Sequence, residues 1–223
     1  MANPASGFDL LSPVYDLLQR LFFGNSLVRA QNYFLAPPQK TGTVLVVGGG
    51  TGKILVEMLR QNIGQSYVYV DISKSMIRAT KRRVRRYFKT EKADGARPRI
   101  QYVCADIGRM PLAKYDLVIT PFVLDCFGDA ALSLLIPKLA QALSRRGSWI
   151  FTDFHIAEGR PQPLARLLIR FLYFCFNRFC GLQRSQLPDF PFFFRSAQLE
   201  MNAEYFFLRG LVVTRVYRPA AVP

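Results

Sequence analysis

The sequence is poor in the side chains that bind transition metals. It contains one histidine, His155, and four cysteines, none of which forms a C-x-x-C pair. A zinc site made of cysteine and histidine needs several such ligands, usually in closely spaced pairs. We therefore expect no metal site, and we expect the cysteines to be reduced thiols in a cytosolic protein.

Long uncharged hydrophobic runs are also missing. Half of the 223 residues are hydrophobic, but no stretch approaches the roughly 18 uncharged residues of a transmembrane helix. The N-terminus lacks a basic region followed by an apolar core, which predicts that there is no signal peptide. We expect a cytoplasmic protein, or one peripheral to the inner face of a membrane, and the length fits one α/β domain.

The stretch TVLVVGGGTG, residues 43–52, combines a short apolar run with a cluster of glycines. The β-branched run 43–47 has no polar alternation, which is typical of a strand buried on both faces of a parallel sheet. An amphipathic helix pattern follows Gly52. A strand that turns through glycines into a helix leaves backbone N–H groups unpaired, and the missing Cβ atoms let a ligand approach the main chain.

A second predicted strand, residues 67–70, ends at Asp71, nineteen residues beyond Gly52. An acid at this strand tip is placed to accept hydrogen bonds from both ribose hydroxyls of an adenosine cofactor. The glycine spacing separates the cofactor classes. A dinucleotide fold needs G-x-G-x-x-G/A, but Lys53 occupies the third position, which disfavours an NAD-type oxidoreductase.

Gly48, Gly50 and Gly52 read G-x-G-x-G. This spacing resembles motif I of the Rossmann-like (class I) S-adenosylmethionine-dependent methyltransferases, [DE]-x-G-x-G-x-G. One residue departs from that motif, because Val46 stands where the family usually has an acid. Four later segments also resemble this superfamily: residues 70–77, 103–107, 115–120 and 143–147.

The resemblance implies S-adenosylmethionine as the cofactor and a set of contacts around it. The glycine loop would contact the cofactor, Asp71 the ribose, Ile72 and Met76 the adenine ring, and Asp106 the adenine amino group. The complete set of expected cofactor contacts is Gly48, Gly49, Gly50, Thr51, Gly52, Asp71, Ile72, Met76, Asp106, Ile107, Thr120 and Pro121.

The resemblance also implies a doubly wound α/β fold with a mostly parallel seven-stranded sheet, helices on both faces and an antiparallel C-terminal hairpin. The hairpin is expected over 203–208 and 211–217, about Arg209 and Gly210. Helices are expected from Ser12 and over 27–34, and a fifth strand over 148–154 after a helix capped by Asp129 and ended by Gly147. The divisions are a helical cap at 1–40, a cofactor-binding core at 41–157, an insertion at 158–200 and the hairpin at 201–223.

Residues 1–40 resemble small-molecule members related to the ubiquinone and menaquinone biosynthesis methyltransferases, through Val14-Tyr15-Asp16 and Phe23-Gly24. In the superfamily such helices close over the cofactor. The alternative is a cap on an exposed sheet edge. The insertion contains an amphipathic stretch, Leu164 to Cys180, followed by further phenylalanines up to Phe194. It predicts a substrate lid, a membrane-interface helix or an ordinary core helix, and the pattern does not separate these.

Basic residues outnumber acidic ones by 30 to 15, a net charge of +15. Many lie between Lys81 and Lys89, opposite an apolar helical stripe. This pattern predicts either a solvated helix face or weak contact with a membrane surface or nucleic acid.

Taken together, the sequence predicts an enzyme that transfers a methyl group to a small, lipophilic molecule. In-line displacement at a sulfonium asks mainly for alignment and exclusion of water, so few catalytic residues are expected. His155, at the end of the fifth strand, is the candidate general base. The alternatives are an RNA or DNA methyltransferase and a catalytically inactive cofactor-binding protein.

Overall fold

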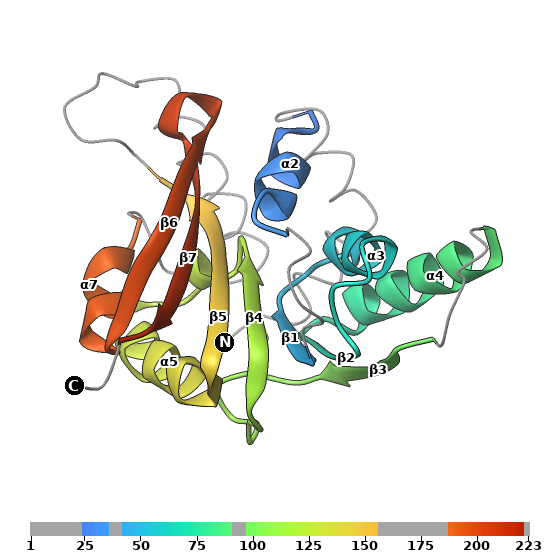
Figure 1. Ribbon diagram of the computed structural model, residues 1–223, viewed down its shortest axis with the longest axis horizontal. Helices are drawn as coiled ribbons and strands as arrows, with labels where there is room; N and C mark the ends of the chain where they lie inside the picture. Colours follow the sequence, from blue (N-terminus) through green and yellow to red (C-terminus); the bar gives the residue numbers. More distant parts are fainter. Residues whose placement is uncertain (1–23, 36–41, 91–96, 156–186, 221–223) are drawn as a thin grey trace, which may run out of the picture.

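The computed structural model describes residues 24–35, 42–90, 97–155 and 187–220. Seven strands form one sheet in the order β3-β2-β1-β4-β5-β7-β6 (Figure 1). The strands are β1 Thr43–Val47, β2 Ser66–Asp71, β3 Arg99–Cys104, β4 Tyr115–Pro121, β5 Leu143–Phe154, β6 Leu199–Phe207 and β7 Val212–Pro219. Strands β1 to β5 pair in parallel, while β7 runs antiparallel to β5 and to β6. This confirms the predicted fold class and the C-terminal hairpin.

Helices cover both faces of this sheet. They are α2 Ser26–Asn32, α3 Lys53–Arg60, α4 Lys74–Thr90, α5 Asp129–Ala142 and α7 Phe190–Ser196, with 3-10 turns η1 Leu124–Cys126 and η2 Leu208–Gly210. Strand β1 shows why both faces are needed. Leu45 and Val47 belong to the core shared with α5 and α7, while Val44 and Val46 belong to the core shared with α3 and α4. Its uninterrupted apolar sequence therefore matches burial on two sides.

The predicted second N-terminal helix is confirmed as α2, and the predicted helix start at Ser12 lies outside the described residues. The prediction for α5 was wrong at both ends. Gly128 precedes the helix and Asp129 is its first residue, and the helix stops at Ala142 rather than at Gly147. Lys114 binds the free carbonyl of Gln141 at 2.6 Å, and Leu143 already pairs with Tyr115 of β4. Strand β5 thus begins five residues earlier than expected.

Helix α7 lies in the described part of the predicted insertion and packs into the main core. The ring of Phe194 stacks on Tyr217 with 3.9 Å between centroids and meets Trp149 edge-on at 4.9 Å. Phe190 and Phe193 are buried beside it, whereas Phe192 is exposed. Within the described part of the chain, no helix is long and apolar enough to cross a membrane.

This packing predicts a large difference between two neighbouring phenylalanines. Phe194→Ala removes a fully buried ring and should lower the free energy of unfolding by about 3–5 kcal/mol. Phe192→Ala is the matched control and should change it by less than about 0.5 kcal/mol, because that ring is 56% exposed. Urea unfolding followed by tryptophan fluorescence measures both. Equal effects would contradict the assignment of α7 to the core.

Candidate cofactor site

The glycine loop joins β1 to α3 at the carboxyl edge of the sheet. Gly48, Gly50 and Gly52 have φ values of +66°, +60° and +81°. These angles lie in the left-handed region that glycine adopts without steric cost. Gly52 is also the residue that precedes the first turn of α3. The loop therefore ends at a helix N-terminus, the place where backbone N–H groups favour a negative or polar ligand.

The absent Cβ atoms of this loop make room for protein side chains. A Cβ on Gly49 would stand 2.5 Å from the hydroxyl of Tyr69, and one on Gly52 would stand 2.6 Å from Cγ2 of Thr80. A Cβ on Gly48 would collide with Val123. The prediction that the glycines admit a ligand to the main chain is thus incomplete, because at these three positions glycine is required by internal packing.

Three side chains hold the loop from α4 and β2. The carbonyl of Gly50 accepts hydrogen bonds from the Tyr69 hydroxyl and the Thr80 hydroxyl, both at 3.0 Å. Nε of Arg83 donates to the carbonyl of Thr51 at 2.9 Å. Sequence reasoning missed these residues, because no motif marks a hydroxyl that reaches a loop from a distant helix. They stabilise a loop that lacks the acid usual in motif I. Val46 stands at that position and is fully buried in the apolar core.

The structure brings the loop and the two predicted acids together. Gly48 N–H donates to Val70 O at 2.9 Å, which places the loop beside the end of β2. Ala105 N–H donates to Asp71 O at 3.2 Å, which places Asp106 beside Asp71. The carboxylates accept from nearby backbone, Asp71 from Ser73 N–H and Asp106 from Gly108 N–H, each at 2.9 Å. The predicted acids thus lie at the ends of adjacent strands.

The other predicted contacts divide into exposed and buried residues. Ile72 is 37% exposed and offers an apolar surface next to Asp71. Met76, Ile107, Thr120 and Pro121 are buried. The hydroxyl of Thr120 accepts a hydrogen bond from the indole of Trp149 at 2.8 Å. These four side chains are therefore packed within the protein beneath this edge of the sheet.

His155 follows β5 at the same edge of the sheet. Its backbone N–H donates to Leu211 O at 2.8 Å, and its ring lies 5.3 Å from that of Phe206. Among the described residues, no group of three His, Cys, Asp or Glu side chains is placed to hold a metal ion.

Two buried acids at this edge escaped sequence reasoning. Asp153, near the end of β5, is fully buried and Asp125 in η1 is 4% exposed. The Asp153 carboxyl accepts from Phe154 N–H at 2.9 Å and from Asp125 N–H at 3.2 Å, which ties η1 to β5. Burial, and then the charge of Asp125, raise the pKa of Asp153 well above its usual range. Only the fold reveals this pair, because the two acids are 28 positions apart.

The site fits the adenosine half of S-adenosylmethionine. Asp71 would hold the ribose hydroxyls, Ile72 would cover one side of the adenine, and Asp106 would accept from the adenine amino group. The glycine loop would contact the cofactor through its backbone. At the methionine end the chain differs from motif I, since the buried Val46 offers no carboxylate.

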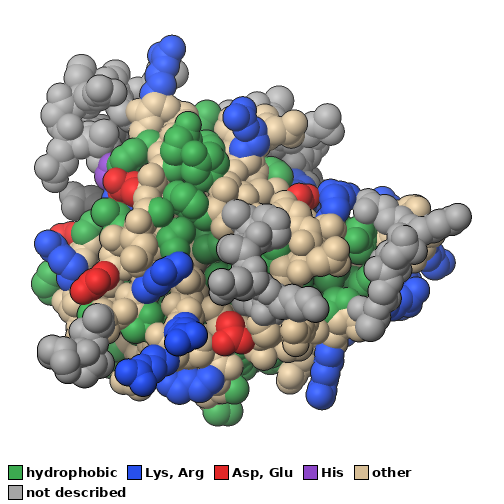
Figure 2. Space-filling model, in the orientation of Figure 1, with side chains coloured by type: hydrophobic (Ala, Val, Ile, Leu, Met, Phe, Trp, Pro, Cys, Tyr) green, Lys and Arg blue, Asp and Glu red, His purple; other side chains and the backbone are tan. Residues whose placement is uncertain are grey.

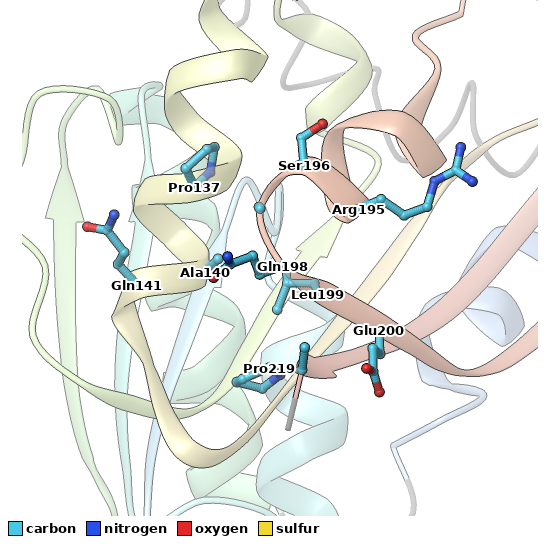
Figure 3. Close-up of a pocket in the computed structure, with 11 residues that line it drawn as sticks. Pro137, Ala140, Gln141, Arg195, Ser196, Gln198, Leu199, Glu200 and Pro219 are labelled. Carbon is cyan, nitrogen blue, oxygen red and sulfur yellow. The ribbon is translucent and has the colours of Figure 1, made fainter. Parts of the chain in front are cut away.

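The structure also contains an open hollow of about 720 Å³ that lies away from this site. It is bordered by the end of α5, the end of α7 and the first residues of β6 (Figure 3). Leu199 of β6 and Pro219 of β7 line it, and these residues pair with each other far from the carboxyl end of β5. The hollow is therefore at the opposite edge of the sheet.

The fold is that of the class I, Rossmann-like S-adenosylmethionine-dependent methyltransferases, and the site fits the cofactor of that class. More particularly, residues 44–147 match the family described as "Methyltransferase domain". The narrower resemblance to ubiquinone and menaquinone biosynthesis enzymes stays a prediction.

Known proteins similar to the chain carry the same class name. Acetylserotonin O-methyltransferase of Rattus norvegicus is 30% identical over 123 residues, which are 55% of this chain and 27% of that protein. The chain thus spans about a quarter of that relative's length. The mitomycin 7-O-methyltransferase MmcR superimposes with a TM-score of 0.69 at 18% identity, over 96% of this chain and 60% of its own. An S-adenosylmethionine-dependent methyltransferase from Clostridium acetobutylicum superimposes with a TM-score of 0.63 at 12% identity. The match covers 96% of this chain and 99% of that protein.

Asp71 should carry much of the cofactor affinity. We expect Asp71→Ala to weaken binding of S-adenosylmethionine and S-adenosylhomocysteine by about 1.5–3 kcal/mol, because charge-assisted hydrogen bonds to the ribose are lost. Isothermal titration calorimetry measures this change. Asp129→Ala, which removes an exposed acid from α5, is the control and should leave the affinity unchanged. Tight binding of NAD with none of S-adenosylmethionine would contradict the site.

The buried acid pair predicts a pH dependence of stability. Because the folded-state pKa of Asp153 is raised, the unfolded chain releases this proton at lower pH than the folded chain does. The stability that this group contributes is therefore lost as the pH rises above about 4, which is the pKa of an aspartate in the unfolded chain. Relative to Asp153→Asn, the wild-type free energy of unfolding should fall between pH 4 and 7. Urea unfolding across this range tests the sign, and a difference that does not vary with pH would refute it.

Proposed function

We propose that the chain methylates a small apolar molecule. The observation that carries this proposal is a group of aromatic side chains where α2 meets the end of β6. Tyr33 stacks on Tyr205 with 4.1 Å between ring centroids, and Phe207 lies 4.9 Å from Tyr205. These residues are far apart in the sequence, so the group exists only in the folded chain.

Much of this aromatic surface is accessible. Tyr33 is 47% exposed and Tyr205 is 44% exposed. Figure 2 shows hydrophobic side chains gathered along β6 on this face of the molecule. Contiguous exposed apolar surface, rather than scattered single residues, is typical of a binding site. An aromatic or prenyl-like acceptor buried here gains about 25 cal/mol per Å² of apolar surface removed from water.

The aromatic surface borders the strand ends that face the cofactor site. The Thr214 hydroxyl of β7 donates to Ala30 O at 2.9 Å and so fixes α2 over this edge of the sheet. Beneath it, the rings of Phe122 and Phe154 lie 5.2 Å apart at the ends of β4 and β5. An acceptor held by Tyr33 and Tyr205 would therefore lie near the ends of the central strands.

S-adenosylmethionine supplies a methyl group on a cationic sulfur. Transfer would break the bond from this methyl to sulfur and form a bond from it to the acceptor, so the chain's role would be to align the acceptor and exclude water. An acceptor hydroxyl would also release a proton, and His155 is the group we assign to take it. The O-methyltransferase names of the rat relative and of MmcR support an oxygen acceptor.

The segment from Leu164 to Phe194, which the sequence predicts as a possible substrate lid, lies largely outside the described residues. Phe171 and Phe174 are among the residues that are not described. In its described part, Phe193 is a core residue and Phe192 is exposed beside it. The acceptor surface proposed here therefore rests on α2 and β6.

The test is a transfer assay with labelled S-adenosylmethionine against aromatic and prenyl-like alcohols, with acetylserotonin among them. We expect the double variant Tyr33→Ala, Tyr205→Ala to lower kcat/KM for the best acceptor about tenfold or more, because apolar contact is lost. Its affinity for S-adenosylmethionine should not change. Leu134→Ala, which removes a 75% exposed side chain from α5, is the matched control.

Methyl transfer to RNA extracts alone would favour the nucleic-acid methyltransferase alternative. Binding of S-adenosylmethionine without transfer to any acceptor would favour the inactive cofactor-binding protein. Either result would overturn the proposed small-molecule activity while leaving the cofactor site in place.

A further inference from the structure

The region formed by α4 and β3 is strongly basic. Between Asp71 and Asp106 the described residues include ten lysines and arginines and no acid. Five of these cations define a basic stripe: Lys74, Arg78, Arg82, Arg85 and Lys89. All five are exposed. Figure 2 shows lysine and arginine side chains around the α4 end of the molecule.

The stripe follows one face of α4. Its members are spaced four, four, three and four residues apart, which keeps them on the same side of a helix with 3.6 residues per turn. Successive cations are therefore about 4.5–6 Å apart along the axis, and the stripe is about 22 Å long. Lys81 and Arg86 are exposed on either side of it.

Edge strand β3 extends this surface. Arg97, just before β3, and Arg99 within it are both exposed. Lys81 lies 5.3 Å from the centre of the Tyr102 ring and Arg97 lies 5.0 Å from that of Phe88. In the part of the chain that the structure describes, no ion pair joins the stripe residues to an acid. The five stripe residues are exposed, so their charges face the solvent.

The character of the α4 face favours one of two anionic partners. A helix that docks on a membrane inserts apolar side chains into the interface. The apolar side chains Met76, Ile77, Val84 and Tyr87 are instead buried against the sheet. The exposed side of α4 carries cations and no exposed apolar side chain. Binding here is Coulombic, and a row of cations suits a polymer with regularly repeated negative charges.

We propose that the basic stripe, with Arg97 and Arg99, is a docking surface for the phosphodiester backbone of nucleic acid. Arginine matches this ligand because its guanidinium donates two parallel hydrogen bonds to one phosphate. Such contacts position a strand without reading its bases. The surface is separate from the aromatic acceptor surface on α2 and β6, so docking requires no methylation of the nucleic acid.

The experiment is fluorescence anisotropy of the full chain with a labelled 20-nucleotide single-stranded RNA between 50 and 200 mM KCl. Neutralising five phosphates predicts a slope of log K against log salt of about −3.5, since each single-strand contact contributes about −0.7. The variant R78Q/R82Q/R85Q/K89Q should bind about tenfold or more weakly at 100 mM KCl, with a slope reduced toward zero.

Two further variants make the test specific. R145Q/R146Q/R195Q/R218Q removes the same charge from exposed sites outside α4 and β3 and should retain the wild-type slope. R78K/R82K/R85K keeps the stripe charged and should retain binding within about threefold, which also shows that substitution there preserves the fold. The proposal is overturned if both Gln variants weaken binding equally, if RNA binding does not depend on salt, or if vesicles with 30% phosphatidylserine bind the stripe and RNA does not.

Discussion

The cofactor site depends on the hydrogen bonds that fix the carbonyl of Gly50. Tyr69 from β2 and Thr80 from α4 donate to that one oxygen, and Arg83 holds the next carbonyl. The same Tyr69 and Thr80 fill the space that Cβ atoms on Gly49 and Gly52 would need. The loop geometry and its hydrogen bonds therefore depend on each other. A larger residue in place of Gly52 would strain the backbone, and one at Gly49 or Gly52 would displace the side chains that donate to Gly50. This explains how the loop is kept in place although Val46 replaces the usual acid.

On the other side of β1, a second buried polar contact organises the carboxyl ends of β4 and β5. Asp153 accepts the N–H groups of Phe154 and Asp125, so the turn after β4 is attached to the end of β5. That turn carries Val123, which occupies the space next to Gly48. The acid pair and the glycine loop are thus joined through Val123. A change at Asp153 is expected to reach the cofactor loop through this contact, because tightly packed interiors transmit displacement.

The molecule separates three surfaces by chemistry. The carboxyl edge over β1, β2 and β3 holds the acids and the glycine loop, the region of α2 and β6 holds exposed aromatic rings, and α4 with β3 holds exposed cations. Residues on one helix serve two of these surfaces. Thr80 and Arg83, three positions apart, point to the loop, while Arg82 and Arg85, also three apart, remain exposed on another side of the helix.

The sequence by itself determined β1, the glycine loop, the helix after it and Asp71 at the tip of β2, because these follow from local periodicity and from spacing within one strand–turn–helix unit. The later strands and Asp106 were expected from the resemblance to methyltransferase motifs. The sequence did not determine the end of α5, where Lys114 and strand pairing with Tyr115 stop the helix before Gly147. Nor did it reveal Tyr69, Thr80, the pair Asp125–Asp153 or the stack of Tyr33 on Tyr205. These contacts join residues from 19 to 172 positions apart, and only the tertiary structure brings them within hydrogen-bond or ring-contact distance.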